Sequence, residues 1–301
     1  MSMYLAIDIG GTKTLLALFS KTGRMVKKRK FLTDQNPKRF ARDLKDNLHL
    51  FFPKRLAIPT LNAVTVAVAA TVDSKFKIED AHLTGKPLVY GNLEWKDFEF
   101  AENIAYCINN LFITKRVKRP RLTEKTLPFC PITIGNDATL ATLAEAEGMP
   151  GKVIYLTYST GIGGGIWEDG KISDRSNKYE PGHRKYIFES KWREYEDIAS
   201  ANAIHDAYGQ IATDVKGPEN FKDIALRMSI GLGDIIKEED PDAIIIGGAL
   251  GIRLRYYKKY LTRFLAVSLG RRERDLPNII AAKTPLESVV YGCYKNGKSK
   301  N

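Results

Sequence analysis

Residues 4 to 14 read Tyr-Leu-Ala-Ile-Asp-Ile-Gly-Gly-Thr-Lys-Thr. The apolar run that carries Asp8 predicts a strand. Gly10-Gly11 then predicts a turn, because glycine tolerates positive φ and lets backbone N–H groups approach a ligand closely. Thr12 and Lys13 add further donors, and a carboxylate followed by a donor-rich turn suits magnesium and nucleotide phosphates. An ordinary β-hairpin explains the same residues, since a second apolar run follows, and one turn can serve both purposes.

Three more turns of this kind follow apolar strands later in the chain. Residues 157–166 read Thr-Tyr-Ser-Thr-Gly-Ile-Gly-Gly-Gly-Ile, and residues 242–251 read Asp-Ala-Ile-Ile-Ile-Gly-Gly-Ala-Leu-Gly. Between the first turn and these two, Asn136-Asp137-Ala138 brings an acid to the start of an alanine-rich helix. One glycine turn is weak support for a ligand site, whereas four strand-end turns in this order form a specific pattern.

With these motifs the chain resembles the ROK family of sugar kinases and repressors, within the sugar kinase/actin superfamily. The resemblance extends over nearly the whole length and includes Asn92-Leu93-Glu94-Trp95, Gly182-His183 and Glu196. It implies an α/β protein with a two-domain actin-like, ribonuclease H-like ATPase fold and a ligand cleft between the domains. The expected small N-terminal α/β domain comprises residues 1–130 plus 285–301, and the large C-terminal α/β domain comprises residues 131–284.

The resemblance also implies ATP-dependent phosphorylation of a hexose hydroxyl, with ATP and Mg²⁺ as cofactors. Glucose, giving glucose 6-phosphate, is the leading substrate, and fructose, mannose, an N-acetylhexosamine or another polyol are alternatives. A non-catalytic sugar sensor is a further alternative. A repressor of the family would need an N-terminal winged helix, and because this chain starts directly in the kinase domain we expect no such role.

Asp137 is the expected catalytic base, because it matches the catalytic segment of the family, and it is also expected to contact the sugar. Asn136 would hydrogen-bond sugar hydroxyls. Both have a structural alternative, since Asp and Asn are preferred helix N-caps and either could simply cap the helix expected at 138–147. Asp8 would hold magnesium, directly or through water.

The nucleotide would be held by the glycine turns. The resemblance assigns phosphate contacts to Gly10, Gly11, Thr12, Lys13, Thr160, Gly161, Gly163 and Gly164, and adenosine contacts to Gly247 and Gly248. Lys13 has an alternative as a solvent-facing turn lysine, and the last two glycines could serve only a tight, well-packed turn. Ser159 stands where the family usually has glycine.

The resemblance also implies residues that contact the sugar. They are Glu180, His183 and Glu196, with Asn92 as a weaker candidate. Carboxylates and imidazole can hydrogen-bond vicinal hydroxyls. Alternatively, His183 is an ordinary loop histidine, and Glu196 is a first-turn helix acid favoured by the helix dipole.

The chain departs from the family between His183 and Glu196. Most relatives have a Cys-rich zinc motif there, to which the histidine contributes, but residues 184–195 contain no cysteine. Structural zinc needs four N or S ligands, so we expect no zinc. The aromatic residues of the shortened segment are expected to pack it in place of the metal; they are Tyr186, Phe188, Trp192 and Tyr195.

Composition limits the remaining possibilities. The 301 residues can form about two domains, and no apolar run approaches the ~20 residues that span a bilayer. A strand near the N-terminus leaves no room for a signal peptide, and three scattered cysteines fit a reduced cytoplasm. A homodimer is left open.

The net charge of +12 is concentrated in residues 1–130, which carry 23 Lys/Arg against 12 Asp/Glu. Basic clusters at 27–30 and 115–121 could neutralise nucleic-acid phosphates, but they are more often solvated surfaces. No helix-turn-helix, zinc finger or interleaved aromatic pattern accompanies them. We therefore expect no nucleic-acid partner and no membrane partner.

Apolar periodicity predicts strands over 3–9, 14–20, 25–32, 63–70, 132–134, 153–158, 162–167, 170–172 and 242–246. It predicts helices over 37–52, 96–111, 138–147 and 285–294, and others that begin near 196, 219 and 249.

Overall fold

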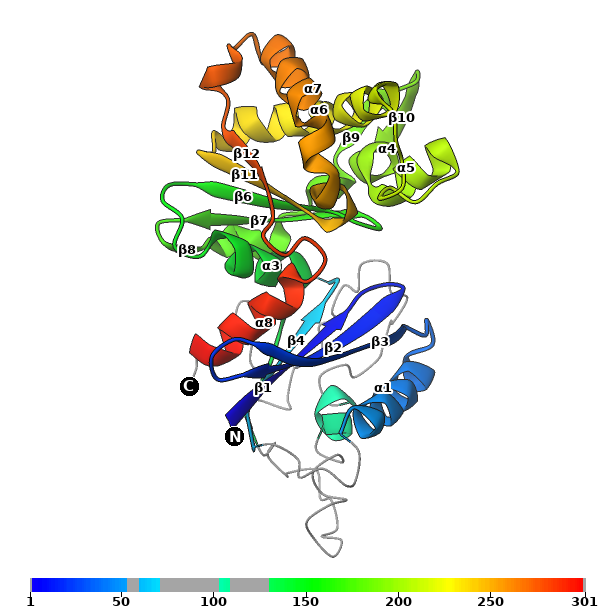
Figure 1. Ribbon diagram of the computed structural model, residues 1–301, viewed down its shortest axis with the longest axis vertical. Coiled ribbons are helices and arrows are strands. Elements are labelled where there is room, and N and C mark those ends of the chain that lie inside the picture. The colour runs from blue at the N-terminus through cyan, green and yellow to red at the C-terminus, as the bar shows by residue number, and fades with distance from the viewer. Residues whose placement is uncertain (1, 53–59, 71–102, 109–129, 300–301) are drawn as a thin grey trace, which may run out of the picture. The chain divides into compact units, whose positions relative to one another are not determined.

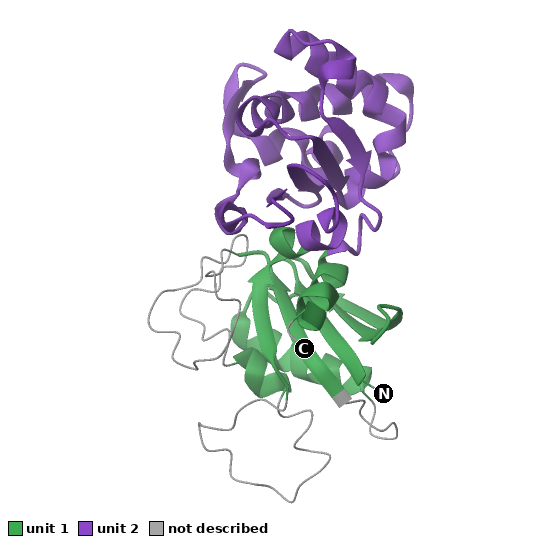
Figure 2. Ribbon diagram, turned by 90° about the vertical axis from the view of Figure 1, so that its left-hand side faces the viewer, with its two compact units in different colours: residues 1–140, 289–301 green, residues 141–288 purple. Residues whose placement is uncertain are grey.

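The computed structural model describes residues 2–52, 60–70, 103–108 and 130–299. It divides into two compact units, residues 1–140 with 289–301 and residues 141–288 (Figure 2). The first unit is therefore discontinuous in sequence. Its boundaries follow residues 140 and 288 rather than 130 and 284, because a strand that starts at Ile132 belongs to the first sheet. Asn92, the basic cluster 115–121 and most of the predicted helix 96–111 lie outside the described residues, although 103–108 are helical.

Unit 1 is built on a five-stranded sheet in the order β3-β2-β1-β4-β5 (Figure 1). Its strands are β1 (Ser2–Ile9), β2 (Lys13–Ser20), β3 (Met25–Leu32), β4 (Thr60–Val68) and β5 (Ile132–Asn136). The first three form the antiparallel meander that the sequence predicts. Strands β1, β4 and β5 are parallel, so their carboxyl ends lie at the same edge of the sheet.

The alternation of side chains along β1 divides the core of unit 1 into two layers. Leu5, Ile7 and Ile9 point to one face and share a core with α1 (Pro37–Phe51). Tyr4 and Ala6 point to the other face and share a core with α8 (Ser288–Ser299), which Figure 1 shows beside the sheet. Because side chains alternate with period two, Asp8 continues the second series.

The basic cluster 27–30 lies on β3, an edge strand of this sheet. Lys27 Nζ donates to Phe51 O at 2.5 Å, and Arg29 Nε donates to Asn47 Oδ1 at 2.7 Å. Two of its four basic side chains thus bond to α1. Charged side chains on an edge strand also hinder pairing with another chain, so this cluster has a structural explanation.

Unit 2 contains a second five-stranded sheet, in the order β12-β11-β6-β7-β8. Its strands are β6 (Val153–Tyr158), β7 (Ile162–Glu168), β8 (Lys171–Ile172), β11 (Ala243–Gly247) and β12 (Asn278–Ala281). Long helices α6 (Pro218–Glu239) and α7 (Gly248–Leu269) pack their apolar faces on this sheet (Figure 1). Strand β12 was not predicted. No helix among the described residues is long and apolar enough to span a membrane.

The described part of the chain also contains shorter helices and turns. They are α3 (Asp137–Ala146), α4 (Tyr195–Ala199), α5 (Ala201–Tyr208), and the 3₁₀ turns η1 (Asp174–Lys178), η2 (Pro181–His183) and η3 (Glu273–Asp275).

The cysteine-free segment after His183 forms a β-hairpin that the sequence analysis did not predict. Strands β9 (Lys185–Phe188) and β10 (Lys191–Glu194) pair in antiparallel register with a two-residue loop. The loop residues Glu189 and Ser190 both have positive φ, 50° and 62°, as a type I′ turn requires. Such turns usually use Asn-Gly or Asp-Gly, which is why Glu-Ser gave no turn signal.

This loop provides the first testable prediction. Ser190→Gly is expected to stabilise the protein by roughly 0.5–1 kcal/mol, because glycine adopts positive φ without the steric penalty of a Cβ. Thermal unfolding should shift upward by about 2 °C. Ser190→Ala keeps the Cβ and serves as the control, with no stabilisation expected. An equal gain from alanine would contradict the backbone explanation.

Candidate active site

Two acids lie at the carboxyl edge of the unit 1 sheet. Asp8 is the penultimate residue of β1, and Asp137 follows β5 directly. The register aligns Ile9 with Val68 of β4, and Val68 with Asn136 of β5. The ends of all three parallel strands are therefore level, and ligands commonly bind outside such strand ends.

The two carboxylates are electrostatically coupled. The pKa of Asp8 is raised to about 7, mainly by burial and in addition by the Asp137 carboxylate, while Lys30 opposes the shift. Near neutral pH, proton uptake or a bound cation would therefore relieve the cost of this negative charge. Carboxylate oxygens are the ligands that Mg²⁺ prefers, so the Asp8 carboxylate suits the magnesium role predicted for it, which remains a prediction.

Asn136 caps helix α3, which is the role that the sequence analysis gave as the alternative to sugar binding. Its Oδ1 accepts from the N–H of Thr139 at 2.9 Å, and its Nδ2 donates to Ala70 O at 3.1 Å. Asp137 Oδ1 accepts from the N–H of Ala138 at 2.7 Å. An ionised carboxylate has about four lone-pair sites, so this bond does not prevent Asp137 from accepting a proton. The catalytic and sugar-binding roles of both residues remain predictions.

The turn between β1 and β2 is a tight hairpin. The N–H of Gly10 donates to Lys13 O at 3.1 Å, and the side chain of Gln35 donates to Gly11 O at 2.6 Å. Neither glycine has positive φ. Glycine at position 10 is explained instead by space, because a Cβ there would lie 3.2 Å from Lys13 O.

In unit 2, the turn after β6 and the turn after β11 lie side by side. Tyr158 forms a β-bridge with Gly248, and Gly248 has a φ of +70°. A Cβ on Gly248 would collide with Tyr158 O and lie 2.6 Å from Ser159 Oγ. Ser159 is accommodated, with its hydroxyl 3.1 Å from Thr157 Oγ1. Two of the predicted nucleotide turns thus lie against each other in this unit.

Other glycines of these turns have a packing explanation. A Cβ on Gly247 would collide with the Tyr155 hydroxyl, and a Cβ on Gly164 would lie 2.9 Å from the Tyr179 ring and 3.0 Å from Leu156. Their nucleotide contacts remain predictions, as do those of the more exposed Thr160, Gly161 and Gly163.

Glu196 joins the predicted sugar side to the turn after β6. Its Oε2 accepts from the N–H of Ile162 at 3.2 Å. A Cβ on Gly161 would lie 2.5 Å from this oxygen, and a Cβ on Gly182 would lie 3.0 Å from it. Gly161 therefore makes room for the Glu196 carboxylate, whereas a Cβ on Gly182 would collide first with Ile162 O. The sugar contact of Glu196 remains a prediction.

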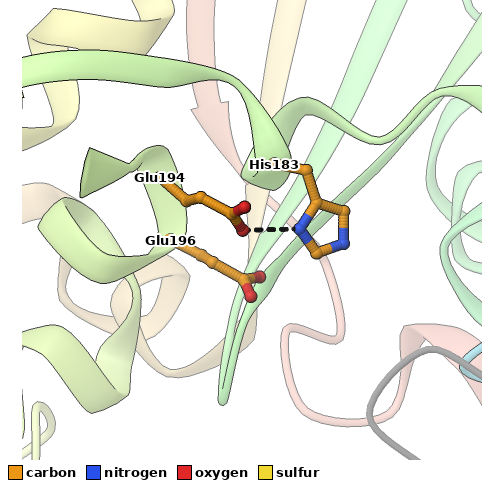
Figure 3. A group of neighbouring side chains, drawn as sticks. All are labelled: His183, Glu194 and Glu196. Carbon is orange, nitrogen blue, oxygen red and sulfur yellow. Dashed lines mark hydrogen bonds and ion pairs between the residues drawn. The ribbon is translucent and has the colours of Figure 1, made fainter. Parts of the chain in front are cut away.

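His183 lies beside two carboxylates (Figure 3). Its Nδ1 is 2.9 Å from Glu194 Oε2, and one ligand atom from each of His183, Glu194 and Glu196 lies within 4.8 Å of the others. The hydrogen bond to Glu194 raises the pKa of His183, with further contributions from Glu196 and Glu180, while partial burial lowers it. Sequence reasoning missed Glu194. The available signal for the hairpin that carries it was the aromatic and β-branched run Tyr186-Ile187-Phe188, which is typical of a strand.

The aromatic residues of this segment divide into two groups. Tyr195 is fully buried, its hydroxyl lies 2.7 Å from that of Tyr158, and Tyr186 packs on its ring at 5.7 Å. Phe188 lies under the Arg227 guanidinium. Trp192, however, is 70% exposed, so the prediction that it packs the segment is wrong. It is on the outward face of the hairpin, opposite Ile187.

A single nitrogen with two carboxylates is not the four-ligand N/S set of a structural zinc site. The residues gathered at His183 therefore do not fit a structural zinc site of that kind, and the zinc-free expectation remains a prediction.

The sequence matches the ROK family over residues 4–294. The chain belongs to the ROK family. No curated protein matches it significantly in sequence.

Solved structures of ROK proteins share its fold. A Streptomyces griseus ROK glucokinase in complex with glucose and AMPPNP is 19% identical, with a TM-score of 0.74 over 99% of each chain. An inorganic polyphosphate/ATP-glucomannokinase from Arthrobacter sp. strain KM is 20% identical, with a TM-score of 0.67 over 100% of each chain. A ROK transcriptional regulator, a homologue of the E. coli MLC protein, is 14% identical with a TM-score of 0.64, covering 99% of this chain and 78% of that one. The two-unit, actin-like α/β fold expected from the sequence is confirmed.

Proposed function

We propose that this ROK protein is an ATP-dependent sugar kinase that phosphorylates a hexose hydroxyl, with glucose as the leading substrate. The observation that carries the proposal is the coupled pair Asp8 and Asp137 at the carboxyl edge of the unit 1 sheet. Fructose, mannose and N-acetylhexosamines are the alternative substrates. ROK membership supports the general activity, and the sugar kinases among its structural relatives are consistent with it.

In this proposal Asp137 accepts the proton of the sugar hydroxyl while that oxygen attacks the γ-phosphorus of ATP, and the bond from this phosphorus to the β,γ-bridging oxygen breaks to release ADP. Phosphoryl transfer depends mainly on positioning and charge stabilisation. The turn at residues 10–13 and the turn after β6 would supply phosphate donors, and Gly247-Gly248 would contact adenosine. Glu180, His183 and Glu196 would hold the sugar hydroxyls, together with Asn136.

Magnesium would be held through Asp8, whose carboxylate and raised pKa fit a cation site. When bound, Mg²⁺ would neutralise charge on the phosphates of ATP. Asp8 would serve this role directly or through water.

We also place the protein in a reducing cytoplasm, because Cys107, Cys130 and Cys293 are buried and unpaired. Burial raises the pKa of each thiol, which suppresses the reactive thiolate.

A non-catalytic sugar sensor is the second candidate. It is favoured by the shared fold with a ROK regulator and by the capping bonds of Asn136, which occupy both ends of its amide. A sensor would bind sugar without consuming ATP.

The proposal is tested by ADP release from MgATP in the presence of glucose, fructose, mannose, N-acetylglucosamine and N-acetylmannosamine in turn. At least one sugar should raise ADP release well above the rate with ATP alone and yield a sugar phosphate by mass spectrometry. If calorimetry detects binding of one of these sugars but none is phosphorylated, the sensor is the correct function.

A further inference from the structure

We propose that Glu194 is a positioning residue that holds the His183 imidazole in one tautomer, with Nδ1 protonated and Nε2 free to contact a polyhydroxyl ligand. The inference deepens the proposed function, because it assigns a residue outside the predicted sugar contacts to the sugar side of the site. It starts from the direct contact of 2.9 Å between His183 Nδ1 and Glu194 Oε2 (Figure 3).

The chemistry of the two groups determines the tautomer. An ionised carboxylate can only accept hydrogen bonds, whereas a neutral imidazole has one donor and one acceptor nitrogen. Glu194 therefore requires the proton on Nδ1, and in the neutral ring Nε2 becomes the acceptor. A partner on one nitrogen commonly selects the state of the other.

The backbone holds Glu194 in place from both sides. Glu194 pairs with Lys185 at the base of the hairpin, and the N–H of the next residue, Tyr195, donates to Arg184 O at 2.8 Å. The Tyr195 side chain is buried, and its hydroxyl donates to Met228 O at 2.7 Å. The carboxylate is thus carried by a well-anchored segment.

The neighbouring Glu196 has a different role. Its Oε2 accepts from the N–H of Ile162 at 3.2 Å, so it is tied to the turn after β6. His183 itself has a side chain that is 52% exposed, and an exposed imidazole without a partner samples several orientations. Among the described residues, Glu194 is the one for which the structure gives a direct hydrogen bond to this ring.

The tautomer can be measured without any enzymatic assay. Long-range ¹H–¹⁵N spectra of the full chain distinguish the two ring nitrogens. Because the pKa of His183 is raised, the spectra are recorded on the alkaline side of its titration, where the ring is neutral. His183→Gln assigns the His183 signals among the four histidines. The wild type should show a protonated Nδ1 and an unprotonated Nε2. Glu194→Gln should show a mixture, because an amide can donate to the ring as well as accept from it.

Sugar binding gives the second measurement, by calorimetry with glucose and with the best substrate of the panel. Glu194→Gln should weaken sugar binding by about three- to tenfold, as expected for loss of one charge-assisted bond at a part-exposed site. It should raise KM for sugar while KM for ATP stays within about twofold. Glu189→Gln is the matched control, since Glu189 lies in the same hairpin but pairs with Arg193 at 3.0 Å, and it should change neither property.

Three results would contradict the positioning role of Glu194. A mixed tautomer in the wild type would overturn it, as would unchanged sugar binding in Glu194→Gln with an unchanged melting temperature. Stoichiometric binding of added Zn²⁺ through His183 Nδ1, with tighter sugar binding in its presence, would also overturn it, because a metal would then orient the ring. If no sugar is phosphorylated, the proposed kinase fails, while the tautomer and sugar-binding results still decide the role of Glu194.

Discussion

Asp137→Asn is expected to lower turnover by roughly 10²–10⁴-fold if Asp137 is the general base of a sugar kinase. Asparagine cannot accept the hydroxyl proton, whereas its amide oxygen can still accept from the N–H of Ala138, as Asp137 Oδ1 does at 2.7 Å. The start of α3 should therefore survive. Steady-state rates with ATP and the best sugar measure the effect, and KM for ATP should change little.

The same substitution separates catalysis from capping. Because the capping bond is retained, the melting temperature should stay within about 2 °C of the wild type, whereas loss of the cap would lower it. Removing the Asp137 charge should also lower the pKa of Asp8, which that charge now helps to raise. Near-normal turnover in the variant would show that Asp137 only begins the helix.

Of the substitutions proposed here, Glu145→Ala is expected to destabilise the protein most, lowering the free energy of unfolding by on the order of 3–4 kcal/mol. Glu145 is buried on α3, and its carboxylate accepts four hydrogen bonds. They come from Lys283 N at 2.7 Å, Thr284 N at 3.0 Å, Thr284 Oγ1 at 2.8 Å and Ser288 Oγ at 2.7 Å. Alanine would leave two backbone N–H groups and two hydroxyls without this acceptor.

Urea unfolding measures this effect, and Glu147→Ala on the next exposed position is the matched control, with a change below about 0.5 kcal/mol expected. The loss of unfolding free energy in Glu145→Gln should lie between those of Glu145→Ala and Glu147→Ala. The amide oxygen of glutamine can still accept hydrogen bonds, but its NH₂ group would face the donors that one carboxylate oxygen now satisfies. Equal unfolding midpoints for Glu145→Ala and the control would contradict a structural role for this carboxylate.

Local patterns were sufficient to predict most strands and helices. The meander of β1, β2 and β3 follows from short turns between apolar runs, and α1 follows from the spacing of Phe40, Leu44 and Leu48, all of which are buried. Hairpin β9–β10 and strand β12 escaped prediction. The hairpin uses Glu189 and Ser190 at positive φ in place of glycine, and β12 is a strand of four residues that pairs only with β11 among the described strands.

The sequence by itself determined the ROK family, the two α/β units and the placement of Asp8 and Asp137 at strand ends, because these depend on periodicity and on motifs contiguous in the chain. Only the tertiary structure decided that Glu194 contacts His183, that Glu145 binds a segment about 140 residues away, and that Trp192 is exposed. Such contacts join residues distant in sequence or depend on which face of a strand turns inward. A one-residue change of register would reverse those faces, and only the packed sheet and its neighbours select the register.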